Sequence, residues 1–338
     1  MPVITARNQV LELYAEAAER RWVVPCFCSE NLTTTEAVLA ATKAYGEKIG
    51  RHDLPITLAI CNQYHHRTQS AYYTHTRRWD IGLRLFVADI GVLTAPGAPF
   101  ARLRVMVHMD HTQHNSDREL LDGDLTPYSS IMYDASALPF EKNLAATRDF
   151  MARRGREIVV EGACDEIVEA ERAEGQDVSQ LTTPERGERF LRETGVDFIV
   201  ANLGTEHRAG AADLTYHGGL ARQIKARVGQ RLVLHGCSSV TAEQVARLFD
   251  DGICKVNIWT ALERDTAPLL FEDMLRNAAK VAGEEAVARW HKEGLLGPRA
   301  ELKGRAALSH FATCHRQQII FEAMQRLVMD YLALWYRV

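Results

Sequence analysis

The chain has 338 residues, of which 46% are hydrophobic and 25% are charged, and its formal net charge is −4. This is the composition of a folded globular protein, and without a basic block interleaved with aromatic residues we expect no nucleic-acid partner. No apolar run approaches the ~18 residues of a membrane-spanning helix, so we expect no membrane partner. Residues 1–22 have the pattern of an amphipathic helix rather than of a secretory signal, which makes a cytoplasmic protein the default expectation.

Apolar runs rich in Val, Ile and Leu recur along the chain and predict strands. They cover residues 23–27, 54–60, 104–110, 128–134, 157–163, 196–202, 231–236 and 253–258. Several are continuously apolar, as strands buried on both faces are. Segments with helical spacing and good start and stop residues lie between them, at residues 33–49, 139–155, 182–195 and 241–252. The cysteines are odd in number and lack a CxxC pair, which favours free thiols.

The alternation of strands and helices predicts an α/β fold with a parallel sheet. Eight strand units over about 260 residues fit a (β/α)8 TIM barrel better than the alternative, an open doubly wound sheet, because no GxGxxG or Walker loop is present. A long insertion after strand 2, between Cys61 and Arg104, is expected to hold extra helix or an ordered loop. We expect the barrel to cover residues 1–285 and a C-terminal helical extension, residues 286–338, to pack on the barrel or on a partner subunit.

Polar side chains gather at the carboxyl ends of these strands, where TIM barrels place their active sites. They are Ser29, Asn31, Cys61, Asn62, Asp110, His111, Asp134, Ser136, Glu161, Asn202, His207, His235 and Asn257. The histidines His111, His207 and His235 follow three different strands and could converge on one zinc ion with a position open for substrate. Asp134 fits a simple N-cap or turn residue as well as it fits a site residue. We expect His108 and His114 to be bystanders, and the histidines of the insertion, His65, His66 and His75, to be solvated loop residues.

Five motifs in a fixed order resemble those of the class II, zinc-dependent ketose-bisphosphate aldolases, which act on fructose or tagatose bisphosphate. They are HMDH (108–111), SSIMYDASALPFEKN (129–143), TGVDFIVANLGTEH (194–207), LVLHGCSS (232–239) and KVNIWT (255–260). The resemblance runs from about residue 10 to about residue 280. It implies a TIM barrel, a zinc ion as cofactor with a monovalent cation as a second candidate cofactor, a sugar-phosphate substrate, and a homodimer or homotetramer.

The resemblance also implies roles for individual residues. His111, His207 and His235 would bind zinc, and Asp110 would exchange a proton with the hydroxyl formed from the aldehyde. A loop glutamate, among Glu166, Glu169 and Glu171, would take the donor's proton. The implied phosphate- and substrate-binding residues are Asn31, Arg208, Gly236, Ser238, Asn257 and Thr260.

The chain departs from the family pattern around the substrate. Ala163 replaces a second glutamate of strand 5, Arg208 follows the second zinc histidine in place of a nearby lysine, Cys237 replaces a glycine, and Trp259 replaces an aspartate. We interpret this as aldol chemistry retained on a changed substrate, with dihydroxyacetone phosphate as the expected donor and a non-glycolytic aldehyde as acceptor. The alternatives are another zinc-dependent lyase or hydrolase and a regulatory barrel without turnover.

Overall fold

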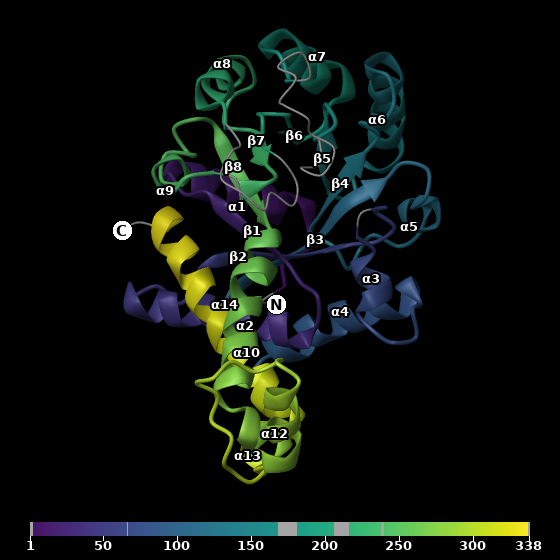
Figure 1. Cartoon of the computed structure of the whole chain (residues 1–338). Coiled ribbons are helices and arrows are strands. Elements are labelled where there is room, and N and C mark those ends of the chain that lie inside the picture. The colour runs from purple at the N-terminus through teal and green to yellow at the C-terminus, as the bar shows by residue number, and fades with distance from the viewer. Residues whose placement is uncertain (1–2, 66, 168–180, 206–215, 238–239, 337–338) are drawn as a thin grey trace.

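The strands form a closed parallel barrel in chain order, β1 to β8, in which β8 pairs with β1 (Figure 1). The computed structural model describes residues 3–65, 67–167, 181–205, 216–237 and 240–336. The strands are β1 (Val24–Cys28), β2 (Pro55–Cys61), β3 (Arg104–Gln113), β4 (Ser130–Asp134), β5 (Val159–Ala163), β6 (Phe198–Val200), β7 (Leu232–Leu234) and β8 (Ile253–Ile258). The predicted TIM barrel is confirmed.

Helices connect the strands and surround the barrel. They are α1 (Arg7–Glu19), which precedes β1, and then α2 (Leu32–Lys48), α3 (Gln69–Tyr72), α4 (Trp79–Thr94), α5 (Arg118–Asp122), α6 (Phe140–Arg154), α7 (Pro184–Thr194), α8 (Gly218–Val228) and α9 (Ala242–Val245). The insertion after β2 contains the helices α3 and α4, as expected. The helix predicted over residues 241–252 is shorter than expected, because α9 ends at Val245 and the chain continues in turns to Gly252.

Strand β3 differs from the sequence prediction in a way that bears on the site. It was expected to end at Asp110, but it continues to Gln113, so His111 lies within the strand. His114 lies just beyond the strand end, as predicted, and its backbone N–H donates to the carbonyl of Asp134 at 3.0 Å. The extra length brings the end of β3 alongside the last residues of β4.

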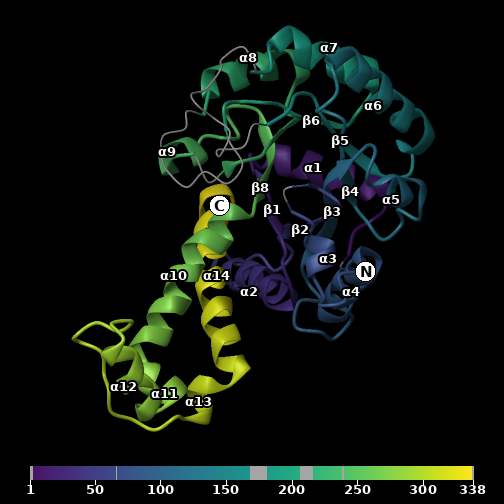
Figure 2. The ribbon, with the colours of Figure 1, turned by 45° about the vertical axis from the view of Figure 1, so that its right-hand side comes forward.

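After β8 the chain is helical, as predicted, with α10 (Thr260–Arg276), α11 (Ala278–Ala282), α12 (Glu284–Lys292), α13 (Leu308–Phe311) and α14 (Thr313–Trp335). Figure 2 shows α10 leaving the barrel, α11 to α13 forming the end of an arm, and α14 running back to the barrel. The end of α14 packs on its own barrel, because the Trp335 indole N–H donates to the Val245 carbonyl at 3.1 Å and the Tyr45 hydroxyl donates to the Tyr336 carbonyl at 3.0 Å. The proposed domain boundary at residue 285 falls within α12 and stays a prediction.

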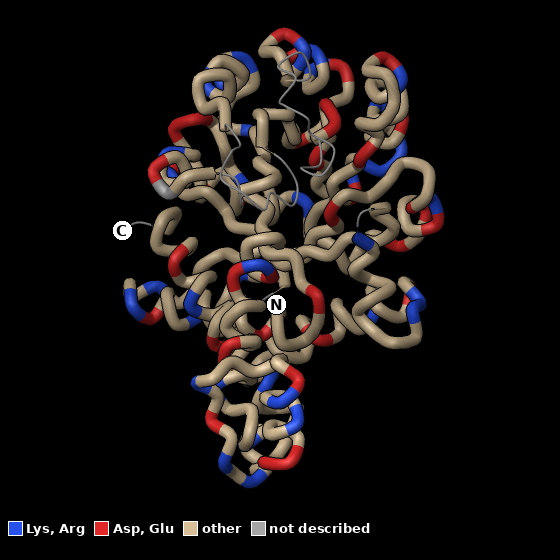
Figure 3. The backbone as a smooth tube through the Cα atoms, in the orientation of Figure 1, with Lys and Arg blue, Asp and Glu red and all other residues tan. Residues whose placement is uncertain are grey.

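The outer surface mixes charges of both signs. Figure 3 shows acidic and basic positions interspersed over the helices that surround the barrel. Within the described part of the chain, no helix combines the length and the apolar character that crossing a membrane requires.

The interior of the barrel contains a buried ion pair beneath the polar end. The Lys255 ammonium lies 2.6 Å from Oε1 of Glu161, and both side chains are completely buried. His108 lies beside them, with Nε2 3.6 Å from Oε2 of Glu161 and Nδ1 2.8 Å from the hydroxyl of Ser130. His108 therefore belongs to the polar interior of the barrel, consistent with its predicted place deeper than Asp110.

We expect Lys255→Met to lower the free energy of unfolding by about 3–5 kcal/mol, because the Glu161 carboxylate would remain buried without its cation. Urea unfolding at pH 7 measures this difference. The double variant Lys255→Met/Glu161→Leu should recover most of the loss, since it removes both charges. A single variant within about 1 kcal/mol of the parent would show that the pair contributes little to stability.

Candidate active site

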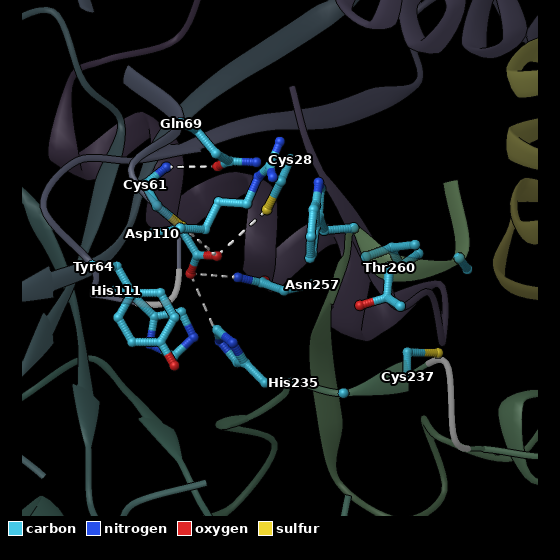
Figure 4. A pocket seen from close by; sticks show the side chains of 15 residues that line it. Cys28, Cys61, Tyr64, Gln69, Asp110, His111, His235, Cys237, Asn257 and Thr260 are labelled. Atoms are coloured by element: carbon cyan, nitrogen blue, oxygen red, sulfur yellow. Dashed lines mark hydrogen bonds and ion pairs between the residues drawn. The ribbon is translucent and has the colours of Figure 1, made fainter. Parts of the chain in front are cut away.

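Two functional side chains come from consecutive positions of β3, Asp110 and His111. Consecutive side chains of a regular strand point to opposite faces. Here the pairing with β4 shifts by one residue between Met109 and Thr112, and His111 has a φ of 45°. This β-bulge turns both side chains into the same cavity, shown in Figure 4. A positive φ at a non-glycine residue is strained by about 1–3 kcal/mol, and such strain is concentrated at functional sites.

Asp110 is buried and held from several directions (Figure 4). The Asn257 side-chain amide donates to its Oδ1 at 2.9 Å. Two thiols, of Cys28 and Cys61, donate to its Oδ2 at 3.4 and 3.7 Å. Strands β1, β2 and β8 therefore all contribute to the position of this one carboxyl group.

Asp110, His111 and His235 form a buried group that could hold a metal ion. One ligand atom from each lies within 4.8 Å of the others, and Nε2 of His235 is 4.0 Å from Oδ1 of Asp110. Burial opposes ionisation of Asp110, but His111, His235 and His108 together outweigh it and hold the pKa of the carboxyl group well below its usual range. A carboxylate oxygen and two imidazole nitrogens are ligands that zinc accepts, so this donor set fits a divalent metal.

Asp134 orients His111 from behind. Its Oδ2 lies 3.0 Å from Nδ1 of His111, and its Oδ1 accepts hydrogen bonds from the backbone and hydroxyl of Ser136 at 3.1 and 2.6 Å. Burial works against ionisation of Asp134, but these hydrogen bonds outweigh it and lower its pKa. The carboxylate accepts the proton of Nδ1, which leaves the lone pair of the ring on Nε2, as a metal ligand requires. Asp134 is thus both a turn residue, one of the two structural alternatives from sequence, and a partner of His111.

The ring of Tyr64 lies flat on the ring of His111, with centroids 4.2 Å apart and planes 8° apart. The rings of His111 and His235 meet edge to face at 4.8 Å. His111 is therefore fixed on one face by an aromatic ring and at its Nδ1 edge by Asp134.

The cavity has a volume of about 60 Å³ and ends at the N-terminus of α10. Its lining residues are Cys28, Cys61, Tyr64, Arg67, Gln69, Asp110, His111, His235, Gly236, Cys237, Asn257, Ile258, Trp259, Thr260 and Ala261. Gly236 has a φ of 71°, a conformation that favours glycine. The first residues of α10, Thr260 and Ala261, direct a helix N-terminus at the cavity, which is a favourable place for a phosphate.

Two other predicted site residues, Asn31 and Glu166, are described and do not line this cavity. Asn31 is exposed and caps α2, where its side-chain oxygen accepts the Thr34 N–H at 3.2 Å, and it does not line the cavity. Glu166 lines a second cavity of about 20 Å³ that shares Tyr64 and His111 with the first. His207, Arg208, Glu169, Glu171 and Ser238 lie outside the described residues.

Sequence reasoning missed Cys28 of the cavity and, from the segment after β2, Tyr64, Arg67 and Gln69. Tyr64 and Arg67 belong to the loop after β2 and Gln69 begins α3, in a segment whose histidines were expected to be solvated. The position of this loop directly after a barrel strand was the available signal, since loops at that edge form the active sites of TIM barrels.

Glu263, in the first turn of α10, is partly buried at the rim of this region, and its Oε1 has no hydrogen-bond partner among the described residues. Burial and the negative charge of Glu30 raise the pKa of Glu263 to about 7, against the opposing effect of Arg67. Because the pKa of the Glu263 carboxyl group is higher in the folded protein than in the unfolded chain, the folded protein binds the proton of this group more tightly. Its contribution to stability is present at low pH and is lost as the pH rises to about 7.

We expect Glu263→Gln to raise the free energy of unfolding by about 1–3 kcal/mol at pH 8 and to have a much smaller effect at pH 5. Glutamine resembles the protonated acid and removes the cost of a buried negative charge. Urea unfolding of both proteins at the two pH values measures the difference. Glu272→Gln, an exposed glutamate of the same helix, is the matched control. An equal effect of Glu263→Gln at both pH values would contradict the prediction.

Comparison with known proteins identifies the family. The model of the family described as fructose-bisphosphate aldolase class-II matches residues 8–295. The chain belongs to this family. Class-II aldolases are metal-dependent carbon–carbon lyases, and the buried Asp110, His111 and His235 group is a suitable place for the metal. The match agrees with the resemblance inferred from the motifs.

Individual members of the class-II family differ considerably from this chain. The D-tagatose-1,6-bisphosphate aldolase subunit GatY of Klebsiella oxytoca is 31% identical over 180 residues, which are 52% of this chain and 60% of that relative. The alignment thus spans less than two thirds of the length of the relative.

Solved structures resemble this one over nearly the whole chain. Fructose-bisphosphate aldolase (Fba) from Campylobacter jejuni has a TM-score of 0.73 at 17% identity, covering 99% of this chain and 95% of that one. A putative fructose-1,6-bisphosphate aldolase from Coccidioides immitis has a TM-score of 0.65 at 22% identity, and the match covers 97% of this chain and 96% of that one. The YdjI aldolase from Escherichia coli K12 has a TM-score of 0.63 at 17% identity, and the match covers 98% of this chain and 97% of that one. At these identities the likeness establishes the fold.

Proposed function

We propose that the protein is a zinc-dependent aldolase that catalyses the reversible aldol cleavage and condensation of a ketose phosphate or bisphosphate. The proposed donor is dihydroxyacetone phosphate and the acceptor is a non-glycolytic aldehyde. The observation that carries the proposal is the buried group of Asp110, His111 and His235 at the carboxyl end of the barrel, beside the N-terminus of α10. Membership of the class-II family supports the reaction class.

The proposed zinc ligands are His111, His207 and His235. His111 is prepared for this role by Asp134, which accepts the proton of Nδ1. A zinc ion bound there would supply Lewis acidity toward the carbonyl group of the donor.

Asp110 is the proposed proton carrier for the hydroxyl group formed from the aldehyde. Its carboxylate lines the cavity and is fixed by Asn257 and two thiols, so it can exchange a proton with a bound substrate without reorienting. Glu166 is a candidate for removal of the donor's proton, and its place in the second cavity beside His111 supports this role. Glu169 and Glu171 remain the other candidates.

The proposed phosphate site is formed by Gly236, Ser238 and Thr260, with Asn257 at the reacting part of the donor. The helix N-terminus at Thr260 supports this placement. Arg208 and Asn31 remain proposed substrate-binding residues. The acceptor end differs from the family pattern because Trp259, which packs against Cys26, Cys28 and Ala59, is part of the wall.

The proposed assembly is a homodimer or homotetramer. Exposed apolar side chains on α10 support a subunit contact there, with exposed fractions of 42%, 66% and 40% at Leu269, Phe271 and Leu275. The free thiols of the cysteines support a reducing compartment, and we propose the cytoplasm.

Proton exchange tests the proposed chemistry. In deuterated water, the zinc-loaded protein should exchange the C3 proton of dihydroxyacetone phosphate, followed by NMR, and a chelator should stop the exchange. This result would establish the donor half-reaction. If zinc is bound but no exchange occurs, the donor is a different compound or the barrel does not catalyse, and the proposal in this form fails.

A further inference from the structure

The tight turn after β2 brings an arginine into the active-site cavity. The Arg67 backbone N–H donates to the Tyr64 carbonyl at 2.9 Å, and the side chains of both residues line the cavity. Among the described residues that line it, Arg67 is the only arginine or lysine. An anionic group in this cavity would therefore have Arg67 as its cationic partner on the described walls.

The guanidinium of Arg67 is held in place before any substrate binds. Its Nε donates to Oε1 of Glu30 at 2.9 Å, and its Nη2 donates to Oε2 of the same residue. Gln69 fixes Glu30 in turn, because its amide donates to Oε1 at 2.7 Å while its own oxygen accepts the Cys61 N–H at 2.8 Å. The guanidinium also lies over the ring of Trp259, 4.6 Å from the centroid. A group fixed in this way loses little entropy when it binds a ligand.

One edge of the guanidinium remains available. Glu30 accepts from Nε and Nη2, and these are the hydrogen bonds that the Arg67 side chain makes to described residues, so Nη1 is not used by them. The Arg67 side chain is 37% exposed while that of Glu30 is 11% exposed, so the arginine is the more accessible member of the pair. A guanidinium has five N–H donors in a plane and can bind a second anion while it keeps the first.

The place of Arg67 relative to the reacting groups assigns it to one end of the substrate. In Figure 4, Cys61 and Gln69, which anchor the Arg67 network, lie on the other side of Asp110 from Cys237 and Thr260. The proposed phosphate of the donor lies at the Thr260 end. Arg67 is held from the ends of β1 and β2, by Glu30 and by the segment that Gln69 fixes to Cys61, and the β1–β2 side of Asp110 is then left for the acceptor aldehyde.

We propose that Arg67 determines acceptor specificity by binding an anionic group, a carboxylate or a phosphate, at the far end of the acceptor aldehyde. The assignment rests on the proposed aldolase function. Trp259 and Glu30 act as positioning residues, because they hold the guanidinium and need not touch the substrate.

The test compares condensation of dihydroxyacetone phosphate with three acceptors in the zinc-loaded protein: glyceraldehyde 3-phosphate, tartronate semialdehyde and neutral glyceraldehyde. The parent should prefer an anionic acceptor over neutral glyceraldehyde. Whichever of the two anionic acceptors reacts with the higher kcat/KM shows whether the group bound by Arg67 is a phosphate or a carboxylate. Arg67→Gln should lower this preference, measured as the ratio of kcat/KM values, by about 10- to 100-fold and mainly through KM, as expected for loss of a charged hydrogen bond. Arg67→Lys should keep part of the preference.

Arg78→Gln is the matched control, because Arg78 also pairs with a carboxylate but lies on the exposed surface. It should behave as the parent. A parent that does not prefer anions would overturn the proposal. So would an Arg67→Gln protein that loses activity equally toward charged and neutral acceptors, since that result indicates only a structural role.

A binding measurement separates this proposal from the proposed function. Calorimetry with 3-phosphoglycerate, tartronate and glycerol, on the parent and on Arg67→Gln, needs no turnover. At least one of the two anions should bind to the parent about 10- to 100-fold more tightly than to Arg67→Gln. This difference is expected even if the protein fails to exchange the proton of dihydroxyacetone phosphate. Equal binding of both anions to both proteins contradicts the role of Arg67.

Discussion

We expect the His111→Ala protein to lose its active-site zinc and to lose carbon–carbon cleavage by about 10³-fold or more. His111 is buried, its Nδ1 proton is accepted by Asp134, and its Nε2 is directed into the group with Asp110 and His235. Removing the ring deletes one proposed metal ligand and also the surface on which Tyr64 stacks. Elemental analysis for zinc and a coupled cleavage assay measure the two losses in the same preparation.

His114→Ala is the control for this variant, because it removes a histidine three positions along the chain that lines neither cavity. It should bind zinc and cleave substrate as the parent does. If His111→Ala stays fully loaded with zinc and active, the assignment of His111 as a metal ligand is wrong.

For Asp110→Asn we expect the opposite combination, retained zinc and a loss of cleavage of about 10²- to 10⁴-fold. Asparagine has nearly the shape of aspartate and can still accept the hydrogen bond that Asn257 donates to Oδ1. It cannot exchange a proton with the substrate hydroxyl. Zinc content and the rate of cleavage, measured over a range of substrate concentrations, should show a fall in kcat.

Asp80→Asn, a change of an exposed carboxylate paired with Arg78, is the matched control and should leave both quantities unchanged. Loss of zinc together with activity in Asp110→Asn would show that Asp110 is itself a metal ligand. Zinc content is measured for this reason, because Oδ1 of Asp110 lies 4.0 Å from Nε2 of His235.

Part of the site could be predicted because the motif residues lie at strand ends. Asp110, His111, His235, Asn257 and Thr260 were all selected from the sequence, and the structure places them around one cavity. Closure of a parallel barrel brings the carboxyl ends of its strands to the same edge, so any polar residue at such an end is a good candidate. Asn31, just after β1, caps the next helix and does not line this cavity, so its role in substrate binding stays a prediction.

The loop after β2 could not be predicted in the same way. Arg67 and Tyr64 follow no periodic pattern, and their approach to the site depends on a turn closed by one backbone hydrogen bond. The partner that fixes Arg67 is Glu30, which is 37 positions away in the chain. Loop conformations depend on such contacts rather than on local propensity, which is why the sequence indicated only extra helix or an ordered loop with solvated histidines.

The sequence by itself determined the alternation of strands and helices, the barrel and the identity of the family, because apolar periodicity, helix caps and short motifs are local properties. Only the tertiary structure decided how side chains meet. The bulge in β3 turns the consecutive residues Asp110 and His111 into one cavity, which no strand periodicity predicts. The pairing of Lys255 with Glu161, across 94 positions, likewise arises only when β8 and β5 take their places in the closed barrel. Periodicity fixes which face of an element is buried, but closure of the barrel fixes which distant residues share that face.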